Sequence, residues 1–264
     1  GSAGRCGRGA GRGAEAPAGA GEGEDFVTRL AARFFGRELM ESEAPMGMQR
    51  IDKPEMYPAT TEVEAGPVPG DSAELARLRP LLAGTQLEAV PLRMAFDAQR
   101  DGWAADSFHR CVDTFGAALV VAETAGGALM GGYNPRGWVG LGEEKNAIAA
   151  FLFTWPGGHR EGYNLADVKL PKTGGGALAV TDLEGSGPLF GVESLCIPLE
   201  GEGEAAKAAR SRLGSYFVRR PDGERTLFAA GEGNRAQLKS LRAYVVDGDP
   251  EKWELDGIIW KTSK

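Results

Sequence analysis

The stretch that decides the fold runs from Asp97 to Trp155 and reads DAQRDGWAADSFHRCVDTFGAALVVAETAGGALMGGYNPRGWVGLGEEKNAIAAFLFTW. After an Asp-Gly turn, residues 103–115 show the apolar spacing of a helix that buries one face. Two strand-like runs, 118–124 and 128–133, flank Ala-Gly-Gly and predict a hairpin. A further apolar run, 147–155, predicts a buried strand. This stretch therefore predicts the centre of a β-rich domain.

The rest of the domain is expected to add short strands at the spacing of a meander. The predicted strands outside the central stretch are 90–96, 165–170, 177–183, 189–199, 238–246 and 257–261, with a hairpin of 215–220 and 225–231 around Pro221-Asp222-Gly223-Glu224. Residues 72–82 predict a helix that Pro80 bends or splits. A turn is expected at 100–102, and a short charged helix or an ordered loop at 204–214. The expected fold is α+β and β-dominated: a two-sheet β-sandwich flanked by short helices, over residues 72–264.

The N-terminal region predicts an extended arm that contains one amphipathic helix. Residues 1–24 are a low-complexity Gly/Ala/Arg tail. Residues 25–41 predict a helix whose apolar stripe either packs on the main domain or docks on a partner. Residues 42–71 predict a Pro-rich extended linker, either a passive tether or a segment that lies along another protein. The candidate partner-binding residues of the arm are Phe26, Leu30, Phe34, Leu39, Ile51, Met56 and Tyr57.

Charge and composition exclude several classes of function. The net charge of −7 argues against a general nucleic-acid binder, which normally presents a basic face. No run approaches the ~20 apolar residues of a membrane span, so the chain is expected to be soluble or at most peripheral to a membrane. Three cysteines are too few for a disulfide framework, and Cys111 and Cys196 are expected to be buried thiols.

The sequence offers no convincing catalytic, cofactor-binding or metal-binding residues. His109 and His159 are the only histidines, and on a helix Cys111 would point about 200° away from His109. No Cys/His spacing suits zinc. The glycine-rich segments 170–177 and 184–191 lack the order of a phosphate loop and predict tight turns. Carboxylates such as Asp182 and Glu184 are expected to be solvated.

In order along the chain, the Asp-Gly turn, the hairpin that ends in MGGY (130–133), AFLFTW (150–155) and GPLFGVESLCI (187–197) resemble the TLDc domain. The resemblance covers roughly residues 75–261. The residues that carry it are Asp101, Gly102, Phe108, Gly116, Gly131, Gly132, Tyr133, Trp138, Phe151, Phe153, Phe190 and Gly191. Two departures stand out: Met130 occupies a position that is usually aromatic, and residues 200–256 look longer than the family's C-terminal part.

The resemblance implies a β-sandwich flanked by helices, without catalytic residues or a cofactor, in a family associated with oxidation resistance and with binding the vacuolar proton pump. Residues 1–64 are also similar in composition to algal plastid-targeted proteins. Three hypotheses follow. The chain is an accessory subunit of a membrane-associated complex such as a plastid photosystem, at the thylakoid, bound partly through residues 1–71. Alternatively it is a cytoplasmic regulator of the proton pump or of oxidative stress, or an enzyme with an unrecognised site.

Overall fold

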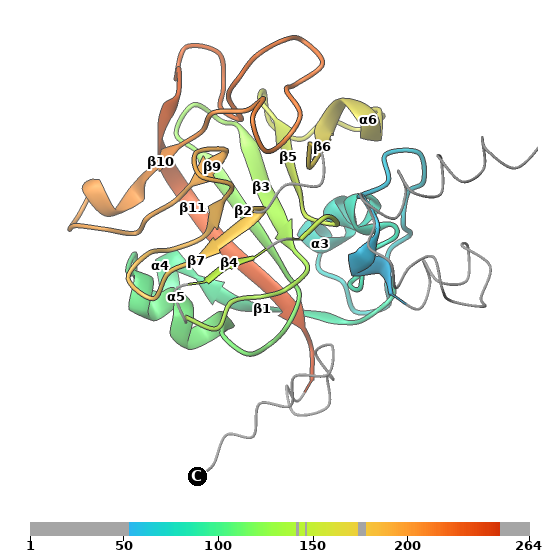
Figure 1. The fold of residues 1–264 in the computed structure, drawn as a ribbon, viewed down its shortest axis with the longest axis horizontal. Helices are drawn as coiled ribbons and strands as arrows, with labels where there is room; N and C mark the ends of the chain where they lie inside the picture. Colours follow the sequence, from blue (N-terminus) through green and yellow to red (C-terminus); the bar gives the residue numbers. More distant parts are fainter. Residues whose placement is uncertain (1–52, 141–142, 146, 174–177, 249–264) are drawn as a thin grey trace, which may run out of the picture. The chain divides into compact units, whose positions relative to one another are not determined.

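The computed structural model describes residues 53–140, 143–145, 147–173 and 178–248 (Figure 1). The helical elements of this part are short: η2 (Pro54–Met56), α3 (Ala73–Leu78), η3 (Arg79–Leu82), α4 (Ala98–Asp101), α5 (Ala105–Val112), α6 (Leu165–Val168) and η4 (Ala205–Lys207). The strands are β1 (Leu92–Asp97), β2 (Ala118–Thr124), β3 (Leu129–Asn134), β4 (Glu143–Lys145), β5 (Phe151–Trp155), β6 (Lys169–Pro171), β7 (Val180–Asp182), β8 (Leu189–Phe190), β9 (Leu195–Cys196), β10 (Ala208–Arg210) and β11 (Arg235–Val246). The prediction of a β-dominated α+β fold is confirmed.

The strands form two antiparallel sheets that share β11. Residues 235–237 of β11 pair with β10, whereas residues 238–245 pair with β2 and residues 242–246 pair with β1. The first sheet continues from β2 through β3 and β5 to β6, and the second runs from β10 through β9, β8 and β7 to β4. Figure 1 shows β11 (orange to red) running across the domain from one group of strands to the other.

Side chains alternate along β2 between two apolar cores, as the period of two in a strand requires. Val120 and Ala122 enter the core enclosed by the two sheets, which also contains Phe190 from the second sheet. Leu119 and Val121 enter a second core, on the other face of the first sheet, which the leucines of α3 and η3 cover. The hairpin of β2 and β3, predicted from its Ala-Gly-Gly turn, is confirmed, and Leu119 lies opposite Tyr133.

The predicted helix over 72–82 is split near Pro80, as expected, into α3 and η3. The Ser72 hydroxyl caps α3 by accepting a hydrogen bond from the Leu75 amide at 3.2 Å. The α-helix ends at Leu78, and Arg79–Leu82 continue as a 3₁₀ turn. Proline has no amide hydrogen to continue the α-helical ladder, which accounts for the change in hydrogen bonding at this point.

Some local predictions are wrong. Residues 165–168 of the expected strand 165–170 form α6, because the Asn164 side chain accepts a hydrogen bond from the Ala166 amide and caps a helical turn. Residues 100 and 101 of the expected turn at 100–102 instead belong to α4, which ends at Asp101 and is capped by Gly102 with φ of 95°. In the expected strand 147–155, β5 begins only at Phe151. The last predicted strand, 257–261, lies outside the described residues.

The predicted hairpin of 215–220 and 225–231 is also wrong, although its turn forms. The Gly223 amide donates to the Arg220 carbonyl at 2.9 Å, as a tight turn requires. The two flanking segments are joined by the Arg220 side chain, which donates to the Thr226 and Phe228 carbonyls, but they form no strand pair, and their backbone amides donate to other parts of the chain. The Val218 amide donates to Pro171, and the Leu227 amide donates to the hydroxyl of Ser211. A turn signal alone therefore did not determine the strand pairing.

Candidate functional site

Three aromatic residues of the TLDc-like pattern, Phe108, Trp138 and Phe190, form a continuous buried group with Phe96 between α5 and the sheets. Phe108 of α5 makes edge-on contacts with Phe96 at 5.4 Å and with Trp138 at 5.2 Å between ring centroids. Trp138 in turn meets Phe190 of the second sheet edge-on at 6.0 Å. All four side chains are buried. This group fixes α5 against both sheets, because edge-on aromatic pairs add to the stability that burial alone provides.

The two glycines of MGGY allow close approach on both faces of β3. A β-carbon at Gly131 would lie 1.9 Å from the Val120 carbonyl oxygen, and one at Gly132 would lie 2.8 Å from the Phe190 ring. Each glycine therefore makes room for a neighbour, as glycines inside strands commonly do. Tyr133 follows them and stacks on Phe151 at 5.3 Å.

Other residues of the pattern also have structural roles within the domain. Asp101 accepts a hydrogen bond from the Asp97 amide at 2.9 Å, and the Arg100 guanidinium beside it holds the pKa of its carboxyl below the usual range. Gly102 and Gly191 have positive φ, 95° and 61°, which glycine adopts without strain. Phe153 is fully buried in the second core.

His109 joins α5 to the turn between β7 and β8. Its Nδ1 lies 2.8 Å from an Asp113 carboxylate oxygen, and its Nε2 lies 2.9 Å from the carbonyl oxygens of both Leu183 and Ser186. Burial alone would lower the pKa of His109, but the hydrogen bonds to Asp113 and to the two carbonyls raise it to about 9. The ring is therefore a cation at neutral pH, with both N–H groups donating.

This arrangement determines what His109 can do chemically. A general base needs a free nitrogen lone pair within reach of a substrate proton. Both nitrogens of His109 face acceptors of the same domain, and the side chain is only 7% exposed. His109 is therefore placed to hold α5 and the 183–186 turn together.

His159 has a different environment, in a group of aromatic rings. Its ring lies 5.0 Å from Trp155 and 5.7 Å from Tyr163 between centroids. Partial burial and the positive charge of Arg77 lower the pKa of His159. At neutral pH the raised pKa of His109 therefore favours its protonated form, whereas the lowered pKa of His159 favours its neutral form.

The expectation that Asp182 is solvated is wrong. Its side chain is fully buried and accepts hydrogen bonds from the amides of Val139 at 2.8 Å and Gly140 at 3.1 Å. Buried carboxylates require such partners. Glu184, by contrast, is exposed as expected. Asp182 thus ties the segment after Trp138 to β7.

The cysteines follow the prediction in part. Cys196 is buried, and burial raises the pKa of its thiol. Its Sγ donates to the Val192 carbonyl at 3.2 Å. Cys111 is half-buried, and burial again raises the pKa of its thiol. Neither environment favours the thiolate that a nucleophile requires.

The described part of the arm lies on the domain itself. Glu55 is buried and accepts a hydrogen bond from the Gln86 side chain at 3.0 Å. Asp71 forms an ion pair of 2.7 Å with the fully buried guanidinium of Arg79. Met56 and Tyr57 are half-buried. The other candidate partner-binding residues lie outside the described residues: Phe26, Leu30, Phe34, Leu39 and Ile51.

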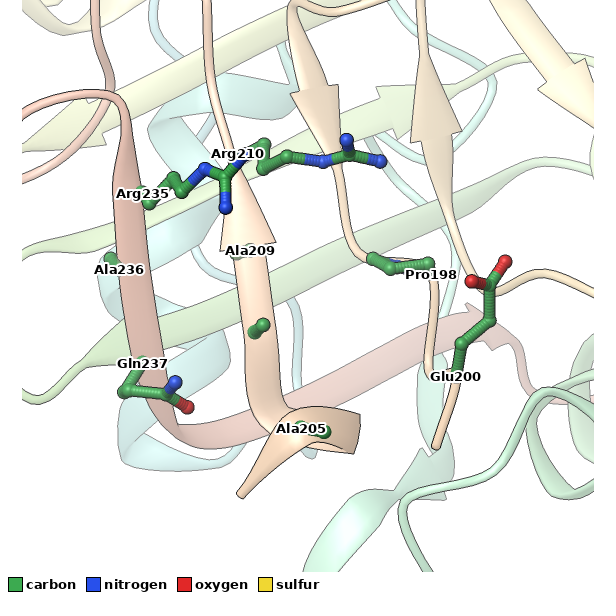
Figure 2. Close-up of a pocket in the computed structure, with 9 residues that line it drawn as sticks. Pro198, Glu200, Ala205, Ala209, Arg210, Arg235, Ala236 and Gln237 are labelled. Atoms are coloured by element: carbon green, nitrogen blue, oxygen red, sulfur yellow. The ribbon is translucent and has the colours of Figure 1, made fainter. Parts of the chain in front are cut away.

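An open hollow of about 470 Å³ lies where β10 pairs with the start of β11 (Figure 2). Small side chains form part of its lining: Ala205 is exposed and Ala208 is half-buried, whereas Ala209 and Ala236 are buried beneath them. Arg210 and Arg235 lie directly opposite each other on the two strands, and both are exposed. Figure 2 shows their side chains extending in the same direction, away from β11 and across β10.

Sequence reasoning missed this hollow because it predicted a helix or loop at 204–214 and began the last long strand at 238. The strand β10 has only three residues, Ala-Ala-Arg, with no β-branched or aromatic side chain to indicate a strand. The pairing of Arg210 with Arg235 depends on the register of two segments that are distant in sequence. No local pattern carries that information.

Within the described residues, no group of three or more His, Cys, Asp or Glu side chains is arranged to hold a metal ion. No helix in the same part of the chain is long and apolar enough to cross a membrane. Comparison with known proteins found no matching family model and no matching curated protein.

Proposed function

We propose that the chain is a non-catalytic binding module of the TLDc type, acting as an accessory or structural subunit of a multisubunit, membrane-associated complex. The observation that carries this proposal is the internal use of the motif residues. Phe108, Trp138 and Phe190 join α5 to both sheets, and Gly131 and Gly132 bring β3 close to its neighbours. A scaffold built in this way leaves its surface and its arm for binding.

The geometry of His109 supports the same proposal. A side chain that donates to Asp113, Leu183 and Ser186 at once stabilises a fixed framework. Proton transfer to a substrate would first require breaking charge-assisted hydrogen bonds, which are among the strongest in proteins.

As the setting we propose a photosystem-type complex at the thylakoid of an algal plastid, with residues 1–71 contributing to the contact. The support is the composition of residues 1–64, which is similar to that of algal plastid-targeted proteins. The competing setting is the vacuolar proton pump, which the TLDc resemblance suggests. Residues 53–71 stabilise the domain through Glu55 and Asp71, so the proposal assigns the partner contact mainly to residues 1–52.

Co-purification tests this proposal. The tagged full-length chain is expressed in an alga, thylakoid and vacuolar membranes are separated, and the associated subunits are identified by mass spectrometry. We expect co-migration with a thylakoid complex. Co-migration with the proton pump would instead support the regulator hypothesis, and a chain that associates with neither complex would contradict the proposal.

The contribution of the arm is tested by deleting residues 1–52. A deletion of 1–71 would also remove Asp71 and leave the buried Arg79 charge unpaired, so loss of binding could then reflect misfolding. A sharper pair of variants is Phe34→Ser, on the predicted apolar stripe, and Arg33→Ser, beside it. The stripe is the contact if only the first variant weakens association, and equal association of both would contradict that assignment.

A further inference from the structure

The hollow at β10 and β11 places two arginines side by side in an acidic chain, with Glu200 also among its lining residues. Arg210 and Arg235 are direct cross-strand neighbours, and like charges in this position destabilise a sheet. The chain as a whole has a net charge of −7. Such a pair is an unfavourable arrangement for folding alone.

Neighbouring basic residues are neutralised, whereas this pair is not. Arg212 pairs with Glu193 at 3.2 Å, and Lys207 pairs with Glu204 at 2.7 Å. Neither Arg210 nor Arg235 has an ion-pair partner in the part of the chain that the structure describes. Their ten guanidinium N–H groups, five from each side chain, therefore remain available to an acceptor from outside.

We propose that this hollow binds an acidic segment of a partner protein, with a carboxylate held by Arg210 and Arg235. Guanidinium groups bind carboxylates through paired hydrogen bonds, which provide both affinity and orientation. The inference goes beyond the proposed function, because the hollow lies between residues 198 and 237 and contains no residue of the arm.

The form of the hollow favours an extended peptide over a small anion or a nucleic acid. It is open, and the exposed Ala205 and half-buried Ala208 give it a small-side-chain surface against which a peptide backbone can lie. Gln237 supplies an amide that can both donate to and accept from a main chain. Figure 2 shows the Glu200 carboxylate on the opposite side of the hollow from Arg235. That carboxylate would repel a polyanion, but it would accept an N–H or a basic side chain of a peptide.

The test uses the full-length protein and a display library of random dodecapeptides. We expect selection to enrich peptides that contain Asp or Glu, and the enrichment to disappear for Arg210→Glu and Arg235→Glu. The matched control is Arg212→Glu, because Arg212 is close in sequence but does not line the hollow; this variant should retain the enrichment. Selection without acidic enrichment, or enrichment that persists in the two hollow variants, would overturn the proposal.

The best enriched peptide is then synthesised with a fluorescent label and titrated by anisotropy. Loss of a charge-assisted hydrogen bond should weaken binding about tenfold for Arg210→Ala or Arg235→Ala. Raising NaCl from about 50 to about 300 mM should weaken it further. Competition with inorganic phosphate distinguishes the two kinds of ligand. If phosphate occupies the hollow as tightly as the peptide does, the site is one for free anions and the peptide proposal is wrong.

The two experiments fail independently. Arm variants that lose the membrane complex leave the peptide selection unaffected, since the selection requires only a folded domain. Conversely, a hollow that enriches no acidic peptide leaves the co-purification result unaffected. Correct folding of the Arg235→Glu variant is verified by its urea unfolding midpoint.

Discussion

Replacing His109 with glutamine should remove a contribution to stability that depends on pH. The pKa of His109 is raised from 6.5 to about 9 by Asp113 and by the carbonyls of Leu183 and Ser186. One pKa unit is worth about 1.36 kcal/mol, so the protonated ring contributes roughly 3 kcal/mol to the free energy of unfolding. The conversion is appropriate because the side chain is only 7% exposed.

The sign follows from the direction of the shift. A group whose pKa is higher in the folded state binds a proton on folding, so its contribution is complete below the unfolded value of 6.5. The contribution is lost as pH rises through about 9. The stability difference between the wild type and His109→Gln should therefore shrink by roughly 3 kcal/mol between about pH 6 and about pH 10.

Urea unfolding followed by tryptophan fluorescence measures this difference at each pH. Groups that titrate in both proteins, such as tyrosines and cysteines, contribute equally and cancel. The matched control is His159→Gln. Because the pKa of His159 is lowered, its protonation opposes folding, and the control should differ from the wild type mainly below pH 6.5.

A direct measurement guards against a variant that fails to fold. The two histidine rings of the wild type give two NMR titrations, which His159→Gln assigns. An imidazole that titrates near 9 supports the argument. A His109 ring that titrates near its usual value of 6.5, or a stability difference that stays constant with pH, would refute it.

The other predictions concern stability and are measured by thermal or urea unfolding. Gly131→Ala should destabilise the domain by about 3 kcal/mol, because the added methyl group meets backbone; Gly66→Ala, which meets nothing within 4 Å, should change stability by less than about 0.5 kcal/mol. Arg235→Glu should stabilise the sheet by about 0.5 kcal/mol by forming an opposite-charge pair with Arg210, and a lowered unfolding midpoint would contradict this. Asp71→Asn should lower the free energy of unfolding by about 3 kcal/mol, because the guanidinium of Arg79 stays fully buried without its carboxylate partner. An unchanged unfolding midpoint would show that the ion pair contributes nothing to stability.

The fold could be predicted from sequence wherever one local pattern decided the structure. The alternation in 118–124 and the turn after it gave the hairpin of β2 and β3 because both signals lie within a few residues. Helix α5 followed from its apolar spacing. The predictions failed where contacts between distant segments determine the structure. The segments on either side of the 220–223 turn form hydrogen bonds with Pro171 and Ser211, and β10 is a strand because it pairs with β9 and β11.

The same distinction applies to the functional residues. The contact of His109 with Asp113 is visible as an i, i+4 pair, but the carbonyls that complete it come from 74 and 77 residues further along the chain. The opposed arginines of the hollow likewise depend on register. The glycines and aromatic residues of the MGGY and AFLFTW segments can be recognised from sequence, because these residue types are distinctive in any sequence.

The position of β11 in the chain has a consequence for synthesis. It is the last described strand, and β1, β2 and β10 all pair with it. Nearly all of the described domain is therefore synthesised before β11 is available to complete either sheet. Until then, the edges of β1 and β2 that pair with β11 have no partner. Exposed strand edges promote aggregation, and pairings distant in sequence form slowly. Until residue 246 has emerged, the nascent chain therefore exposes the edges of β1 and β2 to association with other chains.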